Sequence, residues 1–169
     1  MPTRPENRPT NAPAANDEAA KLYAALSDLV RVYQFRDRDR ICCHDISVTQ
    51  CYALEALTRS GPRTLNELAA ELYLDKSTAS RVVATLERKG YVVRQRHPRD
   101  GRSILLDLTT SGKRLYGRIE RDLVEETRQL LQDFEPAVRQ AAPLLLSRLA
   151  RSAERRSGCA PTSRTACCG

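Results

Sequence analysis

Three thiols lie within ten residues of one another in the first third of the chain: Cys42, Cys43 and Cys51. Thiolates are soft ligands, so this group suits a soft thiophilic ion better than a hard one. Trivalent arsenic and antimony prefer a pyramid of three thiolates. Cys51 falls on the first turn of a predicted helix, where the positive helix end favours the thiolate form. The spacing therefore predicts a site for As(III) or Sb(III) at the start of that helix.

Other interpretations of the cysteines stay open. Four-coordinate zinc would also need His44 or a further thiol, and the spacing matches none of the strong zinc patterns. One thiolate could instead form sulfenic acid that a neighbouring thiol resolves as a disulfide. Cys51 alone also suits a small buried apolar position. Three tail cysteines either add ligands, from the same or a second protomer, or belong to an end without a role: Cys159, Cys167 and Cys168.

A second group of side chains has the chemistry of nucleic-acid contacts. When the apolar stripe of the helix after Asp75 is buried, small polar and basic residues face outward: Lys76, Ser77, Thr78, Ser80 and Arg81. Hydroxyls near a helix N-terminus can meet phosphates or base edges, and an arginine can bind guanine in a bidentate manner. The alternative for the three hydroxyls is ordinary surface polarity of a helix.

Three arginines lie in or beside a predicted hairpin turn: Arg96, Arg99 and Arg102. A tight turn with this charge can approach the DNA backbone or enter the minor groove. Taken singly, Arg96 and Arg99 favour contact with phosphate over contact with bases. We expect Asp100 to shape the turn or orient Arg102.

Apolar spacing and capping residues predict the elements that position these side chains. Capping boxes begin two helices, at Ser47 with Gln50 and at Thr64 with Glu67, and Asp75 caps the next helix. The second helix contains Tyr52, Leu54 and Leu57. The predicted inward faces are Leu65, Leu68, Ala69 and Leu72 in the third helix, and Ala79, Val82, Val83 and Leu86 in the fourth. The predicted helices cover 17–36, 48–60, 65–72, 76–89, 110–133 and 136–156, with strands at 91–96 and 103–108.

The order of four helices, two strands and two helices is mainly α with a small β wing. This order is typical of a winged helix-turn-helix, which places one helix in the major groove of duplex DNA and a hairpin beside it. Charge agrees with that interpretation. The formal net charge is +7, and eight basic against three acidic residues lie between Asp75 and Arg102. The excess positive charge therefore lies on the unit that is predicted to bind DNA.

Composition limits the compartment and the class of protein. No stretch approaches the ~20 apolar residues of a membrane span. The proline-rich N-terminus lacks the apolar segment of a signal peptide, so we expect a cytoplasmic protein with reduced thiols. Two histidines, and no nucleophile set, phosphate loop or suitably spaced carboxylate pair, argue against an enzyme.

The segment LDKSTASRVVATLERKGYVVRQRHPRDGRSILLDLTTSGK resembles the DNA-binding core of the MarR family of bacterial regulators. Its wing pattern D-x-R-x-x-x-L-x-L-T is matched by Asp100, Arg102, Leu106, Leu108 and Thr109. The resemblance extends from about Asp17 to Arg156 and rests on helix order alone at its ends. It implies a homodimer joined through its first and last helices. It also implies binding to a pseudo-palindromic DNA operator with no required cofactor.

We therefore expect a disordered lead at 1–16, a MarR-type domain at 17–156 and a flexible cysteine-containing tail at 157–169. Within the domain, residues 48–109 form the DNA-binding lobe, and helices 17–36 and 110–156 form the dimer. The favoured function is a dimeric repressor that arsenite or antimonite releases from DNA by binding the thiolates. The alternatives are a thiol-based sensor of oxidants and a constitutive DNA-binding or metal-sequestering protein without switching.

Overall fold

The computed structural model describes residues 12–96 and 103–157. The chain divides into two compact units, residues 1–40 and residues 41–169. The predicted tip of the wing, with Arg99 and Arg102, lies outside the described residues, as do the tail cysteines.

The first unit consists, in its described part, of helix α1 (Ala12–Cys42), whose last two residues belong to the second unit. The predicted bounds 17–36 were too short at both ends. Pro13 suits a first helical turn, because its missing N–H is one that helices leave unsatisfied there. No glycine or proline interrupts the chain between Arg36 and Cys42. Neighbouring Arg–Asp pairs, such as Arg36 with Asp37 at 2.7 Å, are compatible with a continuous helix.

The second unit begins with three helices whose starts follow the predicted caps: α2 (Val48–Ser60), α3 (Leu65–Glu71) and α4 (Lys76–Arg88). Both capping boxes are present, with Ser47 accepting from Gln50 N–H and Thr64 from Glu67 N–H. Asp75 caps α4. Gly90 adopts a φ of 74°, a left-handed conformation that glycine adopts without strain and that ends the helix.

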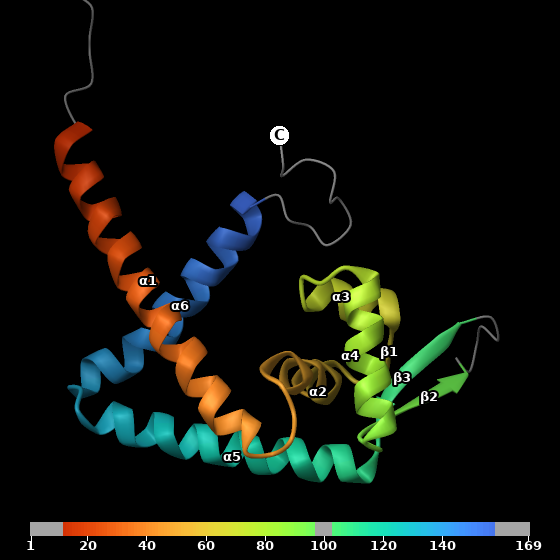
Figure 1. Cartoon of the computed structure of the whole chain (residues 1–169). Helices are drawn as coiled ribbons and strands as arrows, with labels where there is room; N and C mark the ends of the chain where they lie inside the picture. The colour runs from red at the N-terminus through yellow and green to blue at the C-terminus, as the bar shows by residue number, and fades with distance from the viewer. Residues whose placement is uncertain (1–11, 97–102, 158–169) are drawn as a thin grey trace, which may run out of the picture. The chain divides into compact units, whose positions relative to one another are not determined.

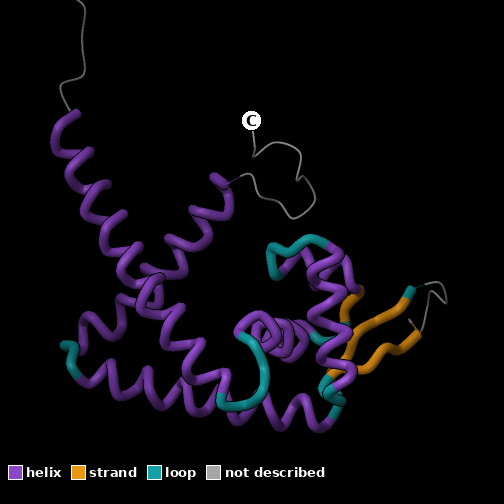
Figure 2. The backbone as a smooth tube through the Cα atoms, in the orientation of Figure 1, coloured by secondary structure: helices purple, strands orange, loops and turns teal. Residues whose placement is uncertain are grey.

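The wing strands are β2 (Val92–Arg96) and β3 (Ile104–Leu108), which pair antiparallel from Val92 opposite Leu108 to Arg96 opposite Ile104. The prediction of a two-stranded ribbon was incomplete. A short strand β1 (Arg63–Thr64) pairs with the other edge of β3, so the order is β1-β3-β2 (Figure 2). Two residues carry no alternating pattern, which is why this strand has no signal in the sequence.

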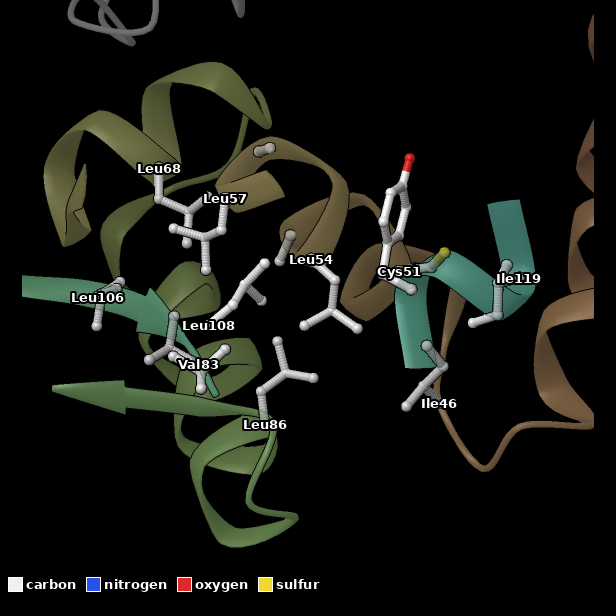
Figure 3. Close-up of a cluster of buried hydrophobic side chains, with 14 of the residues drawn as sticks. Ile46, Cys51, Leu54, Leu57, Leu68, Val83, Leu86, Leu106, Leu108 and Ile119 are labelled. Atoms are coloured by element: carbon white, nitrogen blue, oxygen red, sulfur yellow. The ribbon is translucent and has the colours of Figure 1, made fainter. Parts of the chain in front are cut away.

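The core of the second unit joins α2, α3, α4, the sheet and the start of α5. Leu54, Leu68 and Leu86 are fully buried together with Leu106 (Figure 3). Of the apolar residues of α2, Tyr52 is 44% exposed. Val82 of α4 is half-buried and packs against the core, on the predicted inward face. Three of the buried α2 side chains are small: Cys51, Ala53 and Ala56. Small side chains suit these positions because α2 packs on both α4 and α5, which leaves little room between the helices.

Two long helices complete the second unit: α5 (Thr110–Gln132), which leads away from the wing, and α6 (Pro136–Ser157) (Figure 1). Beyond Ile119, large apolar side chains of these helices lie exposed: Val124, Leu130, Val138, Leu144, Leu145 and Leu146. The first unit exposes another set on α1: Leu22, Tyr23, Leu29, Val30, Val32 and Phe35. None of the described helices is long and apolar enough to cross a membrane.

Candidate nucleic-acid interface

The outer face of α4 carries the predicted DNA-contacting side chains. Ala79, Val83 and Leu86 bury the opposite face, so the helix has one apolar and one polar side. Lys76, Ser77 and Arg81 are exposed, whereas Thr78 and Ser80 are half-buried. The structure therefore places these five predicted residues on one short helix and leaves three of them exposed.

Asp75 organises the first turn of α4. Its carboxylate accepts the Thr78 backbone N–H at 2.8 Å, the Ser77 hydroxyl at 2.6 Å and the Thr78 hydroxyl at 2.9 Å. A hydroxyl that donates to the cap keeps only its lone pairs for DNA. Ser77 and Thr78 are then better placed to accept from an amino group of adenine or cytosine than to donate to a phosphate.

We expect Asp75→Ala to lower the free energy of unfolding by about 1–2 kcal/mol, because the first turn of α4 loses its cap. Asp75→Ser should retain most of the stability, since serine is also a good N-cap. Chemical denaturation of both variants measures the difference. Equal stability of Asp75→Ala and the native chain would show that the cap contributes nothing.

Arg81 is the exposed arginine in the middle of the face. Its Nε donates to the Ser77 carbonyl at 3.4 Å, a long bond that leaves the guanidinium able to reorient. A guanidinium on a helix face that can enter the major groove suits the O6 and N7 atoms of guanine. Arg81 is therefore the side chain of this face best suited to recognise a base.

The wing strand β2 carries Arg94 and Arg96, which differ in their surroundings. Arg94 Nε lies 2.9 Å from Glu87 Oε1 and 3.0 Å from Oε2, so its charge is neutralised within the protein. Arg96, the last residue of β2, is exposed. Of these two arginines, Arg96 is the one predicted to contact DNA, and its exposure is compatible with that role.

The cysteines are distributed differently from the compact cluster that their spacing suggested. Cys43 is exposed in the turn after α1, whereas Cys51 is 3% exposed in the core, in one buried cluster with Ile46 (Figure 3). The side chain of Cys42 is not among those described. Within the described part of the chain, no three His, Cys, Asp or Glu side chains come together to hold a metal ion.

The surroundings of Cys51 are those of a packing residue. It occupies the fourth position of α2 and Ile46 precedes the cap, which is the arrangement of a hydrophobic staple. Burial raises the pKa of the nearby Tyr116 phenol, and Glu55, Glu120 and Cys51 raise it further. A thiophilic ion would reach Cys51 only after local opening of this core.

One contact at the C-terminal end of α4 could not be predicted from the sequence. Lys89 Nζ lies 3.1 Å from Asp45 Oδ2 and also donates to the Asp45 backbone carbonyl. The two residues are 44 positions apart, and no periodic or capping pattern relates them. The contact connects the turn that holds Cys43 to the end of α4.

Comparison with known proteins extends these observations. A family model described as the MarR family matches residues 44–103. An HTH-type transcriptional regulator of Mycobacterium leprae is 33% identical over 132 residues, which are 76% of this chain and 90% of that protein.

Two solved structures share the fold. A MarR transcriptional regulator from Methanosarcina mazei Go1 has a TM-score of 0.70 at 27% identity, over 80% of this chain and 98% of that one. A MarR family protein from Bacillus stearothermophilus has a TM-score of 0.74 at 24% identity, over 81% and 96%. The likeness thus extends well beyond the helix-turn-helix.

Proposed function

Because the chain belongs to the MarR family of DNA-binding transcriptional regulators and is not an enzyme, we propose that it is a homodimeric repressor that a thiophilic metalloid releases from its operator. α4, which we call the recognition helix, enters the major groove, and the wing lies beside it. The proposed contacts are the eight residues predicted from the sequence: Lys76, Ser77, Thr78, Ser80, Arg81, Arg96, Arg99 and Arg102.

Exposed apolar side chains support the dimer. The large apolar residues of α1, and separately those of α5 and α6, are exposed in the single chain. Apolar surface of this extent on a monomer marks an interaction site. Two protomers related by a two-fold axis present their recognition helices to half-sites one helical turn apart, which is about 34 Å. The operator is therefore pseudo-palindromic.

The proposal for the inducer is carried by one observation, the exposure of Cys43 in the turn before α2. Arsenite binds by condensing with three thiols: at each one an As–O bond breaks, an As–S bond forms, and the departing hydroxide takes the thiol proton to leave as water. Cys43 and the adjacent Cys42 supply two thiolates. Burial makes Cys51 the weakest of the three predicted ligands, so we assign the third position to a tail cysteine: Cys159, Cys167 or Cys168.

The test is a DNA-shift titration of fully reduced protein on a fragment from upstream of its own gene. We expect arsenite and antimonite to release the DNA without peroxide. Cys42→Ser and Cys43→Ser should each raise the arsenite concentration for half-release at least about tenfold, since a chelate that loses one of three thiolates is much weaker. Cys51→Ala should change it little.

The other arms of the titration separate the competing functions. Release of DNA by peroxide, with no response of the reduced protein to arsenite, would show that the inducer is an oxidant and not a metalloid. Release by zinc or cadmium alone would indicate a divalent ion with a different ligand set. DNA binding that ignores every thiol reagent would leave a regulator without a cysteine switch. Loss of the response to arsenite in Cys51→Ala alone would show that Cys51 is the third ligand.

A further inference from the structure

The turn between α1 and α2 is held tightly at both ends. Ile41 is 1% exposed and Ile46 is 4% exposed, so both are anchored in the core of the second unit. Between them, the His44 backbone N–H donates to the Ile41 carbonyl at 3.0 Å, and Asp45 adopts a φ of 58°. A non-glycine residue in this left-handed region is uncommon and needs its surroundings to hold it there.

Lys89 supplies part of that support. Its ammonium group binds Asp45 twice, at the backbone carbonyl and at Oδ2, which lies 3.1 Å away. The carbonyl contact matters more than the carboxylate contact, because the Asp45 side chain is 92% exposed and an exposed ion pair contributes little to stability. Lys89 therefore acts on the backbone conformation of the turn that contains Cys43.

Lys89 also lies directly at the C-terminal end of the recognition helix. It is the C-cap of α4, and its backbone N–H donates to the Thr85 carbonyl at 3.1 Å. Gly90 follows directly, and the Tyr91 N–H closes the helix on the Leu86 carbonyl at 2.9 Å. β2 begins at Val92. A displacement of Lys89 thus reaches both the last turn of α4 and the start of the wing.

We propose that Lys89 is the positioning residue that couples the Cys43 turn to the recognition helix. A group attached to Cys43 changes the backbone at Asp45, the Lys89 contact breaks or shifts, and the end of α4 moves with it. This inference rests on the proposed function for its biological role. The physical coupling is independent of which reagent the cell uses, and it can be measured without arsenite.

The experiment is a thermodynamic cycle between Cys43 modification and Lys89 substitution. Cys42 and the three tail cysteines are changed to Ser, so that Cys43 is the accessible thiol and the buried Cys51 is the internal reference. Cys43 is then alkylated with iodoacetamide, and alkylation at Cys43 alone is verified by peptide mass spectrometry. The affinity for the upstream DNA fragment is measured by fluorescence anisotropy with and without the modification, in Lys89, Lys89→Met and Lys89→Arg chains.

We expect alkylation to weaken DNA binding at least about fivefold with Lys89 in place, a typical allosteric coupling. In Lys89→Met the same modification should change the affinity less than about twofold. Lys89→Arg, which keeps a cation and donors, should restore most of the response. If Lys89 had a purely structural role, its substitution would lower the affinity for DNA without altering the effect of alkylation. Thermal unfolding confirms that each variant is folded.

Two results would overturn the coupling. Alkylation that leaves DNA affinity unchanged with Lys89 in place would show that the turn does not reach the recognition helix. An equal effect in Lys89→Met would show that the path avoids Lys89. Neither result depends on release by arsenite, so failure of the proposed inducer and failure of this coupling are distinguishable.

Discussion

Gly112→Ala is expected to destabilise the protein by about 3 kcal/mol, because the site has no room for a methyl group. A Cβ on Gly112 would overlap the Tyr91 carbonyl oxygen and lie 3.0 Å from its carbonyl carbon. That carbonyl cannot move freely, since it accepts the Thr109 N–H at 3.0 Å. Thr109 in turn donates its hydroxyl to Gly90 O at 2.7 Å and accepts the Gly112 N–H at 3.0 Å.

Gly112, Tyr91 and Thr109 form a junction between the end of the recognition helix, the first wing strand and the start of α5. The substitution should therefore affect more than stability. We expect a fall in melting temperature of about 10 °C, from the usual shift of 2–4 °C per kcal/mol for a chain of this size. Operator affinity should fall as well, because β2 starts directly after Tyr91.

Gly117→Ala is the matched control on the same helix. The nearest atom to a Cβ there is the flexible end of Arg121, at 3.8 Å. Alanine in a helix interior is favoured over glycine by roughly 0.5–1 kcal/mol, so this variant should be slightly more stable than the native chain. A Gly112→Ala protein that melts with the native chain would disprove the tight junction.

Arg81→Ala should weaken binding to the cognate operator about a hundredfold or more. One bidentate contact with guanine contributes about 1–3 kcal/mol of discrimination, and a two-fold symmetric dimer loses two of them. Binding to unrelated DNA should change far less, because it depends on phosphate contacts. The measurement is the ratio of specific to non-specific affinity at one fixed salt concentration.

Two controls define what Arg81 does. Arg96→Ala should lower affinity for all DNA sequences alike. It should also reduce the slope of log affinity against log salt concentration by about one per protomer, as expected for the loss of a phosphate contact. Arg118→Ala removes an equal charge from the exposed surface of α5 and should leave the ratio unchanged. A uniform loss for Arg81→Ala, with the ratio preserved, would make Arg81 a phosphate contact instead.

Local patterns were sufficient for most elements of the fold. The caps at Ser47, Thr64, Asp75 and Thr109 begin the helices at the predicted places, because each cap depends only on residues within one turn. Apolar spacing also predicted the face of α4 that packs against the core, although Val82 on that face is only half-buried. The first helix and strand β1 were the exceptions. Alternating Arg and Asp residues carry no apolar period even where the helix continues to Cys42, and the two residues of β1 are too few for an alternating pattern.

Amino-acid order alone thus determined the winged helix-turn-helix, its family and the polar face of the recognition helix, because these follow from short-range periodicity and capping. Tertiary packing decided which neighbours in sequence share an environment. It buried Cys51 while leaving Cys43 exposed, it neutralised Arg94 with Glu87, and it brought Lys89 to Asp45. These outcomes depend on how separate helices and strands pack, and the energy that selects them comes from burial and charge pairing in three dimensions, to which no local pattern is sensitive.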